Sequence, residues 1–156
     1  VPELVHSGPD AHAYARNEWD GTPGSFADFG VDEMIDEMRD IAADIPGGGT
    51  AYIEPTRALV AVDVNTGGDT SSAAGLKANI AAARDLPRQM RIRGLGGQLT
   101  LDLAPMTKKD RQTFESVLRA AFKTDTIDTA LVGFTPLGHY ELQRKRERLP
   151  LRECVK

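Results

Sequence analysis

Two aspartates of this chain lie at the ends of apolar segments, in positions that suit a metal site. Asp63 follows the branched apolar run ALVAV, Asn65 comes two residues later, and Asp102 ends the alternating segment QLTLD. Residues two apart in a strand point to the same side, so Asp63 and Asn65 share one face. If the two strands are neighbours, Asp63 and Asp102 converge. A pair of carboxylates with an amide nearby suits Mg²⁺, or alternatively Mn²⁺, rather than zinc.

Two other interpretations of these acids compete with a magnesium site. Each aspartate taken alone could be a solvated strand end or a cap for the following helix. A calcium loop is the second rival, because DVNTGGD has the D-x-N opening of such loops and a glycine at the sixth position. That loop fails where Gly67 takes a ligand position and where Ala74 replaces the bidentate glutamate.

Basic side chains gather on two later segments and predict a surface for nucleic acid phosphates. The members are Lys77, Arg84, Arg88 and Arg91 on one stripe of a helix, and Arg144, Arg146 and Arg148 at alternate positions of the last strand. Arginine forks match phosphate oxygens, so we expect these elements to line a channel beside the acids. A solvated basic face is the plainer alternative. His6 and His139 have no partner in the sequence that suggests a catalytic dyad, so we expect each of them to have a surface or packing role.

The spacing of apolar residues predicts the elements that must hold these side chains. Helices are expected over 31–44, over 71–93 with a bend at Pro87, and from the capping box of Thr107 and Asp110 to about residue 123, with a short one around 11–19. Strands are expected over 50–54, 58–65 and 98–104, and in TALVGF and GHYELQRKR. This order predicts an α/β fold with a mixed β-sheet and flanking helices.

The composition predicts a soluble, cytoplasmic protein. Cys154 is the single cysteine among 156 residues, so neither a disulfide framework nor a zinc-ligand cluster is expected. The sequence has no apolar run long enough for a membrane span and opens without a signal peptide, so we expect no membrane partner. Residues 1–69 carry 14 acidic and 3 basic side chains, whereas residues 70–156 carry 9 acidic and 16 basic ones, an asymmetry that indicates a polyanionic partner.

Taken together, the motifs resemble the ribonuclease E/G family over residues 47–151. The matching segments are GGGTAYIEPTRALVAVDVNTG, NIAAARDLPRQMRIRGLGGQLTLDLAPM and LGHYELQRKRERLPL. The resemblance implies the catalytic, DNase-I-like part of a single-strand-specific endoribonuclease that acts in RNA processing and decay. It implies that Asp63 and Asp102 bind Mg²⁺ and that Asn65 helps to orient the hydrated ion. The family's basic helix motif corresponds to Asn79, Arg88, Gln89, Arg91 and Arg93, and it adds Arg93 to the predicted RNA-binding residues.

The chain also departs from the family pattern. Pro105 stands where the family usually has another aspartate, three places after the metal ligand, and Pro87 interrupts the motif helix. Neither the S1 domain nor the full pocket that senses a 5′ monophosphate is expected in this segment. The cysteine pair that shares zinc between subunits is represented at most by Cys154, so zinc is not expected as a cofactor. The sequence is closest in character to short forms of the family.

We therefore predict a loop-rich segment with an amphipathic helix over residues 1–46, a catalytic domain over 47–151 and a tail over 152–156. The expected activity is Mg²⁺-dependent cleavage of single-stranded RNA, in which water attacks the phosphodiester and the product carries a 5′ phosphate. A catalytically inactive RNA-binding or assembly module is the main alternative, and a metal phosphatase of small molecules is a third. Since the chain opens on Val1, we expect further domains of a longer parent chain as partners. A homo-oligomer is also compatible with the sequence.

Overall fold

The computed structural model describes residues 25–155, which belong to two compact units. One unit ends at Glu37 and the other begins at Met38. In the first unit, α2 (Ser25–Asp28) leads into α3 (Val31–Arg39) through Gly30, whose N–H donates to the carbonyl of Ala27. The helix expected around residues 11–19 and His6 lie outside the described residues. Within the part that the structure describes, no helix is long and apolar enough to cross a membrane.

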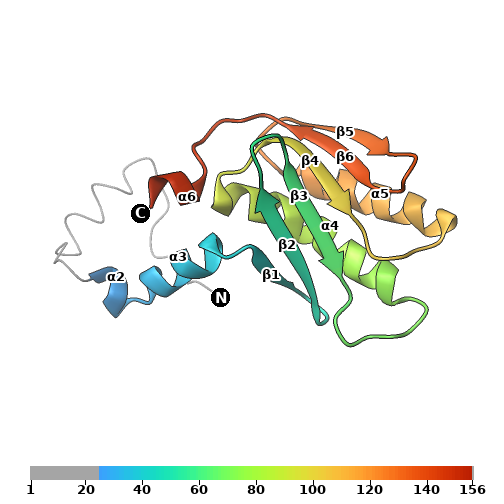
Figure 1. Ribbon diagram of the computed structural model, residues 1–156, viewed down its shortest axis with the longest axis horizontal. Coiled ribbons are helices and arrows are strands. Elements are labelled where there is room, and N and C mark those ends of the chain that lie inside the picture. The colour runs from blue at the N-terminus through green and yellow to red at the C-terminus, as the bar shows by residue number, and fades with distance from the viewer. Residues whose placement is uncertain (1–24, 156) are drawn as a thin grey trace. The chain divides into compact units, whose positions relative to one another are not determined.

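The second unit is built on a six-stranded mixed sheet with the strand order β1-β2-β3-β4-β6-β5 (Figure 1). Its strands are β1 (Ala42–Ile45), β2 (Gly49–Pro55), β3 (Val60–Asn65), β4 (Gly97–Asp102), β5 (Thr129–Phe134) and β6 (Tyr140–Arg144). β3 and β4 run parallel, because the long helix α4 (Ala74–Arg93) carries the chain back between them, and the other neighbours are antiparallel. The prediction of an α/β fold with a mixed sheet and flanking helices is therefore confirmed.

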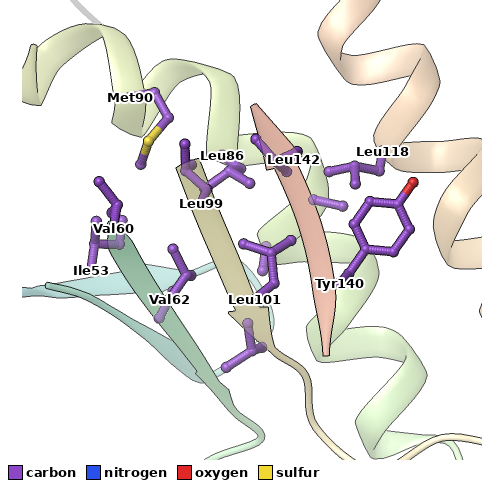
Figure 2. Packing of buried hydrophobic residues seen from close by; sticks show 14 of the residues in the cluster. Ile53, Val60, Val62, Leu86, Met90, Leu99, Leu101, Leu118, Tyr140 and Leu142 are labelled. Carbon is purple, nitrogen blue, oxygen red and sulfur yellow. The ribbon is translucent and has the colours of Figure 1, made fainter. Parts of the chain in front are cut away.

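In the described part of this unit, two helices cover one face of the sheet and none covers the other, which we call the open face. α4 and α5 (Lys108–Lys123) both lie behind the strands in Figure 1, whereas α6 (Leu151–Cys154) is a single turn. Alternate residues of the strands point at the helices, as in the run of Val60, Val62 and Val64. Figure 2 shows Val60 and Val62 in one cluster with Leu86 and Met90 of α4 and with labelled residues of β4 and β6, and Val64 belongs to the same cluster. The intervening strand residues form the open face of the sheet.

The helix predicted over residues 31–44 is wrong beyond Arg39. Residues 42–45 form the edge strand β1 instead, with Ala43 and Ile45 buried and Asp44 exposed. This strand pairs with β2 in an antiparallel hairpin whose tight turn passes through Gly47 and Gly48, at φ values of 101° and 92° that favour glycine. The sheet therefore begins at Ala42, before the expected start of the catalytic domain at residue 47.

The other elements follow their predicted positions with small shifts. α4 begins at Ala74 rather than residue 71, contains Pro87 without ending there, and stops at Gly94 in the left-handed region. Thr107 and Asp110 form the predicted capping box of α5. β6 ends at Arg144, so the predicted alternation of three arginines along one strand is wrong, and Arg146 and Arg148 follow the strand.

Aromatic rings join α5 to the last two strands of the sheet. The ring of Tyr140 makes edge-on contacts with Phe114 and Phe134, at centroid distances of 5.7 and 4.9 Å. Its hydroxyl donates to a carboxylate oxygen of Glu115 at 3.1 Å. Burial, together with this hydrogen bond, raises the pKa of Tyr140 to about 12. The phenol is therefore neutral near pH 7 and holds α5 against β6 at the end of the strand that is next to Asp102.

Candidate active site

Asp63 and Asp102 lie side by side on the open face of the sheet. The parallel pairing of β3 with β4 makes them direct register partners, each near the carboxyl end of its strand. Their strand neighbours Val62, Val64 and Leu101 are buried on the helix side, so both carboxylates point away from the helices. The side chain of Asp102 is 68% exposed. The structure thus brings the two predicted metal ligands together on a surface that solvent and a substrate can reach.

Asn65 contacts this pair through Asp63. Its side-chain amide donates to carboxylate oxygen Oδ2 of Asp63 at 3.0 Å. Because the two residues are two positions apart in β3, the sheet itself aligns them on the open face. The hydrogen bond orients the carboxylate of Asp63 and leaves the amide oxygen of Asn65 on the same side of the strand.

His139 is a neighbour of the acids that the sequence analysis missed. Its ring nitrogen Nε2 lies 3.6 Å from oxygen Oδ1 of Asp102, so the expectation that this histidine has no partner is wrong. The turn between β5 and β6 presents the ring, because the N–H of His139 donates to the hydroxyl of Thr135 at 3.1 Å. Leu101 pairs with Tyr140 across β4 and β6, which places the next residues, Asp102 and His139, at adjoining positions. Only knowledge of this strand pairing could have revealed the contact.

The chain leaving Asp102 is held by the first half of α4. Asn79 is fully buried, and its amide both donates to the carbonyl oxygen of Ala104 at 2.8 Å and accepts from the N–H of Ala104 at 2.9 Å. One turn earlier, Gly75 lies so close to this loop that a Cβ atom would be 1.8 Å from the carbonyl oxygen of Pro105. The family-like position of Asn79 therefore has a structural role, since it fixes the loop that follows the acid.

Replacing Asn79 with leucine should destabilise the fold and disturb the site. The substitution leaves the N–H and C=O of Ala104 unpaired in a buried place, and each such loss typically costs about 1–3 kcal/mol. We expect the free energy of unfolding in urea to fall by about 2–4 kcal/mol. The same change at Gln112, an exposed amide on α5, serves as the control and should cost less than about 0.5 kcal/mol. Equal effects of the two substitutions would show that the clamp on Ala104 contributes nothing.

A second close contact frames the site on the side of Asn65. Gly67 adopts a φ of 65°, and a Cβ atom there would lie 2.0 Å from the carbonyl oxygen of Gly48. The loop that leaves β3 is therefore packed on the turn between β1 and β2, which only glycine permits. This packing explains why glycine occupies position 67. The glycine therefore needs no calcium-binding loop to account for it.

The acid pair offers the ligands that a hydrated Mg²⁺ accepts. Among residues 25–155, no group of three or more His, Cys, Asp and Glu side chains is placed to hold a metal ion. Magnesium commonly binds through one or two carboxylates and keeps several waters, so two aspartates and a nearby amide are a sufficient donor set. Asp63, Asp102 and Asn65 can each offer an oxygen to a metal ion. The imidazole of His139 lies beside Asp102, and the strands of the sheet contain no cysteine. The donor set of Asp63, Asp102 and Asn65 therefore fits magnesium or manganese better than zinc.

The basic stripe of α4 lies on the other side of the sheet from the acids. Its members Lys77, Arg84, Arg88 and Arg91 are exposed, while the opposite side of the helix packs on the strands. Lys77 and Arg84 line an open groove together with Pro46 and Ile80. Because the carboxylates point away from the helices, the expected channel with acids and α4 arginines side by side is wrong. The stripe is a separate surface.

Two of the predicted RNA-binding arginines are buried inside the protein. Arg93 donates to Gln89 at 3.0 Å and to the carbonyls of Asp40 and Ala42, and burial lowers the pKa of its guanidinium group. Arg144 is 2% exposed and donates to the carbonyl of Leu95 at 2.7 Å. Arg93 and Arg144 therefore hold segments of the fold together through buried hydrogen bonds. Arg146, two positions after Arg144, is exposed and available for other contacts.

Arg144 also belongs to a buried ion cluster. It donates to carboxylate oxygen Oδ2 of Asp125 through two of its nitrogens, at 3.2 and 2.9 Å, and Arg91 approaches oxygen Oδ1 of the same carboxylate at 3.2 Å. The side chain of Asp125 is fully buried. One carboxylate thus connects the end of α4, the loop before β5 and the end of β6.

The fold and site define the class of protein as a mixed α/β domain with an exposed carboxylate pair at the carboxyl ends of its parallel strands. The model of the ribonuclease E/G family matches residues 7–147. This chain is 36% identical to ribonuclease E of Synechocystis sp. over 124 residues, 76% of its length and 18% of the relative's. It is 33% identical to ribonuclease G of Salmonella typhimurium over 129 residues, 77% of its length and 26% of that protein's.

A third relative, ribonuclease E of Escherichia coli, is 30% identical over 127 residues, which are 78% of this chain and 12% of that protein. The chain belongs to the ribonuclease E/G family, as its motifs predicted. It spans about a quarter or less of the length of these relatives.

Proposed function

We propose that this chain is the catalytic part of an Mg²⁺-dependent endoribonuclease that cleaves single-stranded RNA in RNA processing and decay. The observation that carries the proposal is the register pairing of Asp63 with Asp102 on the exposed face of the sheet, in a member of a family of ribonucleases. Isolated acids at strand ends are common, but two of them at directly adjoining positions repel each other unless a cation or a proton lies between them. The sheet therefore maintains an arrangement that a divalent ion would stabilise.

Each residue of the site has a distinct part in this proposal. Asp63 and Asp102 hold the cation, and Asn65 keeps the carboxylate of Asp63 in one orientation through its hydrogen bond. A bound Mg²⁺ supplies an activated water and neutralises negative charge on the phosphate. Water would attack the phosphorus as the bond to the 3′ oxygen breaks, and the departing oxygen would take up a proton, so one product would carry a 5′ phosphate and the other a 3′ hydroxyl. Manganese is the alternative ion for the same ligands.

The basic stripe of α4 contributes to RNA binding away from the reacting phosphate. Lys77, Arg84, Arg88 and Arg91 would attract the phosphate backbone without selecting its sequence, and Arg146 would extend this contact. Arg93 and Arg144 are left out of the proposed RNA surface because their guanidinium groups are buried and hydrogen-bonded to the protein. A cytoplasmic location, where RNA is available and Cys154 stays reduced, is part of the same proposal.

The experiment that tests the proposal removes the metal and one of its ligands separately. The full-length protein is incubated with a fluorescent single-stranded RNA in Mg²⁺, in EDTA, and in EDTA followed by excess Mg²⁺, and the product ends are mapped. We expect cleavage only with the metal, products with 5′ phosphates, and no cleavage by the Asp102→Asn variant. Undiminished cleavage in EDTA or by this variant would rule out the metal mechanism.

The same experiment distinguishes a second candidate function. The separation of the α4 stripe from the acids favours RNA binding that does not require the acid pair, as in an assembly module without turnover. Such a module would bind the fluorescent RNA equally well with and without Mg²⁺ and would never cut it. Loss of binding in the double variant Arg84→Glu and Arg88→Glu, with the acid pair intact, would locate that RNA contact on α4.

A further inference from the structure

A tyrosine lies in the same row of the open face as the acid pair. Tyr52 of β2 is the register partner of Asp63, and Asp63 is the register partner of Asp102, so the three side chains occupy consecutive strands. The neighbours of Tyr52 in its own strand, Ala51 and Ile53, are buried on the helix side, which directs the tyrosine ring to the open face. The residue is 40% exposed. A large flat side chain is therefore available from a backbone position about 5 Å from that of Asp63, the usual spacing of neighbouring strands.

The charge of the open face restricts what RNA can offer to it. Five strand positions of this face carry acids, namely Asp44, Glu54, Asp63, Asp102 and Glu141. Among the described strands, the one Arg or Lys is Arg144, whose side chain is buried on the helix side. These carboxylates would repel the phosphates of a bound strand, except where a cation lies between Asp63 and Asp102. The flat face of a base is a contact that this negative charge does not oppose.

From this arrangement we propose that Tyr52 stacks against the base next to the cleaved phosphate and thereby positions single-stranded RNA in the site. The inference rests on the proposed function and adds a substrate-positioning residue to it. Aromatic side chains stack on all four bases, because every base has a π face, so the contact selects an unpaired base rather than a sequence. A base inside a duplex keeps both of its faces stacked and cannot use the tyrosine. Tyr52 therefore contributes to the preference for single strands at the cleavage position itself.

The test combines substitutions of Tyr52 with RNA that lacks single bases. A short single-stranded RNA with one cleavage position is prepared intact and with an abasic nucleotide at each place around that position. We expect Tyr52→Ala to lower kcat/KM for the intact RNA about tenfold, and Tyr52→Phe to stay within about twofold of the wild-type protein. One abasic place should lower kcat/KM for the wild-type protein about tenfold and have no further effect on Tyr52→Ala.

This non-additivity separates stacking from a general effect on the fold. Val132→Ala removes an exposed apolar side chain from β5 and serves as the matched control, with kcat/KM and thermal unfolding unchanged. A 2-aminopurine base at the same place should be quenched on binding to the wild-type protein and to Tyr52→Phe, but not to Tyr52→Ala. If the two defects add at every abasic place, or if Tyr52→Ala cleaves and quenches like the wild-type protein, the inference is wrong.

The outcome also distinguishes this inference from the proposed function. A wild-type protein that cleaves RNA while Tyr52→Ala behaves identically overturns the stacking role and leaves the acid pair as the active site. A wild-type protein that never cleaves RNA in Mg²⁺ overturns the proposed function and this inference with it.

Discussion

Replacing Asp63 with asparagine should abolish RNA cleavage and at the same time stabilise the metal-free protein. The variant keeps the size of the side chain but removes one of the two adjoining carboxylates that would hold the cation under the proposed function. We expect cleavage to fall by more than about a hundredfold, because even groups outside the ligand shell of a metal typically contribute roughly 10–100-fold. Like charges opposite each other in neighbouring strands destabilise a sheet by about 0.2–1 kcal/mol, and the asparagine relieves this repulsion. Urea unfolding in EDTA measures the stability, and the RNA assay measures the activity.

Magnesium titration provides the second half of this prediction. A ligand that binds only the folded state raises the midpoint temperature of thermal unfolding. Mg²⁺ should therefore raise this midpoint for the wild-type protein and leave it unchanged for Asp63→Asn. Glu54→Gln is the matched control, because Glu54 lies on the same face but pairs with Ala61 rather than with an acid. This control should keep both the cleavage activity and the response to Mg²⁺. An unchanged Mg²⁺ response in Asp63→Asn would mean that the ion binds elsewhere.

Replacing Asp125 with alanine should produce the largest loss of stability among the substitutions considered. Its carboxylate is fully buried and accepts from Arg144, which is itself 2% exposed. Removing one partner of a buried ion pair leaves the other charge without compensation and typically costs about 3–5 kcal/mol. We expect a loss of this size in the free energy of unfolding, measured in urea.

Arg146→Ala is the control for this prediction. It removes an exposed arginine two positions after Arg144. The guanidinium of Arg146 lies beside Gly97 and donates a long hydrogen bond to the carbonyl of Gly96 at 3.4 Å. The control should cost less than about 1 kcal/mol. If Asp125→Ala proves equally mild, solvent must enter the cluster in the variant and hydrate Arg144.

The positions of the acids could be predicted from the sequence because strand periodicity and apolar neighbours determine the face of each residue. Asp63 and Asp102 follow buried valines and leucines in strict alternation, and the crossover through α4 makes their strands parallel neighbours. The same alternation places Asp63 and Asn65 together on one face of β3, as the structure shows. The face on which each aspartate lies follows from the alternation of apolar and polar residues in its own strand, which can be read from a single sequence.

The first strand could not be predicted because its short apolar pattern is ambiguous. Ile41 and Ile45 continue the helical spacing of the preceding segment, so the apolar pattern predicts a helix through residue 44. The structure favours a strand because the edge of β2 offers hydrogen bonds to Ala43 and Ile45, and because Gly47 and Gly48 permit a tight hairpin. Pairing with the strand that follows decided the local structure, and residues 40–45 by themselves carry no signal of this pairing.

The roles of the basic residues depend on tertiary contacts for the same reason. Arg144 and Arg146 look alike in sequence, yet one is buried against Asp125 and the other is exposed, since β6 ends between them. Arg88 and Arg93 likewise lie on one helix, but Arg93 meets the carbonyls of Asp40 and Ala42. The contact between His139 and Asp102 requires that β6 lies beside β4, an order that sequence alone does not reveal.

The placement of acids and arginines on opposite sides of the sheet has a consequence for how the chain would engage RNA. Capture through the α4 stripe depends on displaced counterions, so rising ionic strength would shorten the time that RNA stays bound. Turnover at the acid pair, as proposed, would depend instead on the supply of a divalent ion. Residence and turnover would therefore respond to two different ions, and a cell could alter one without altering the other.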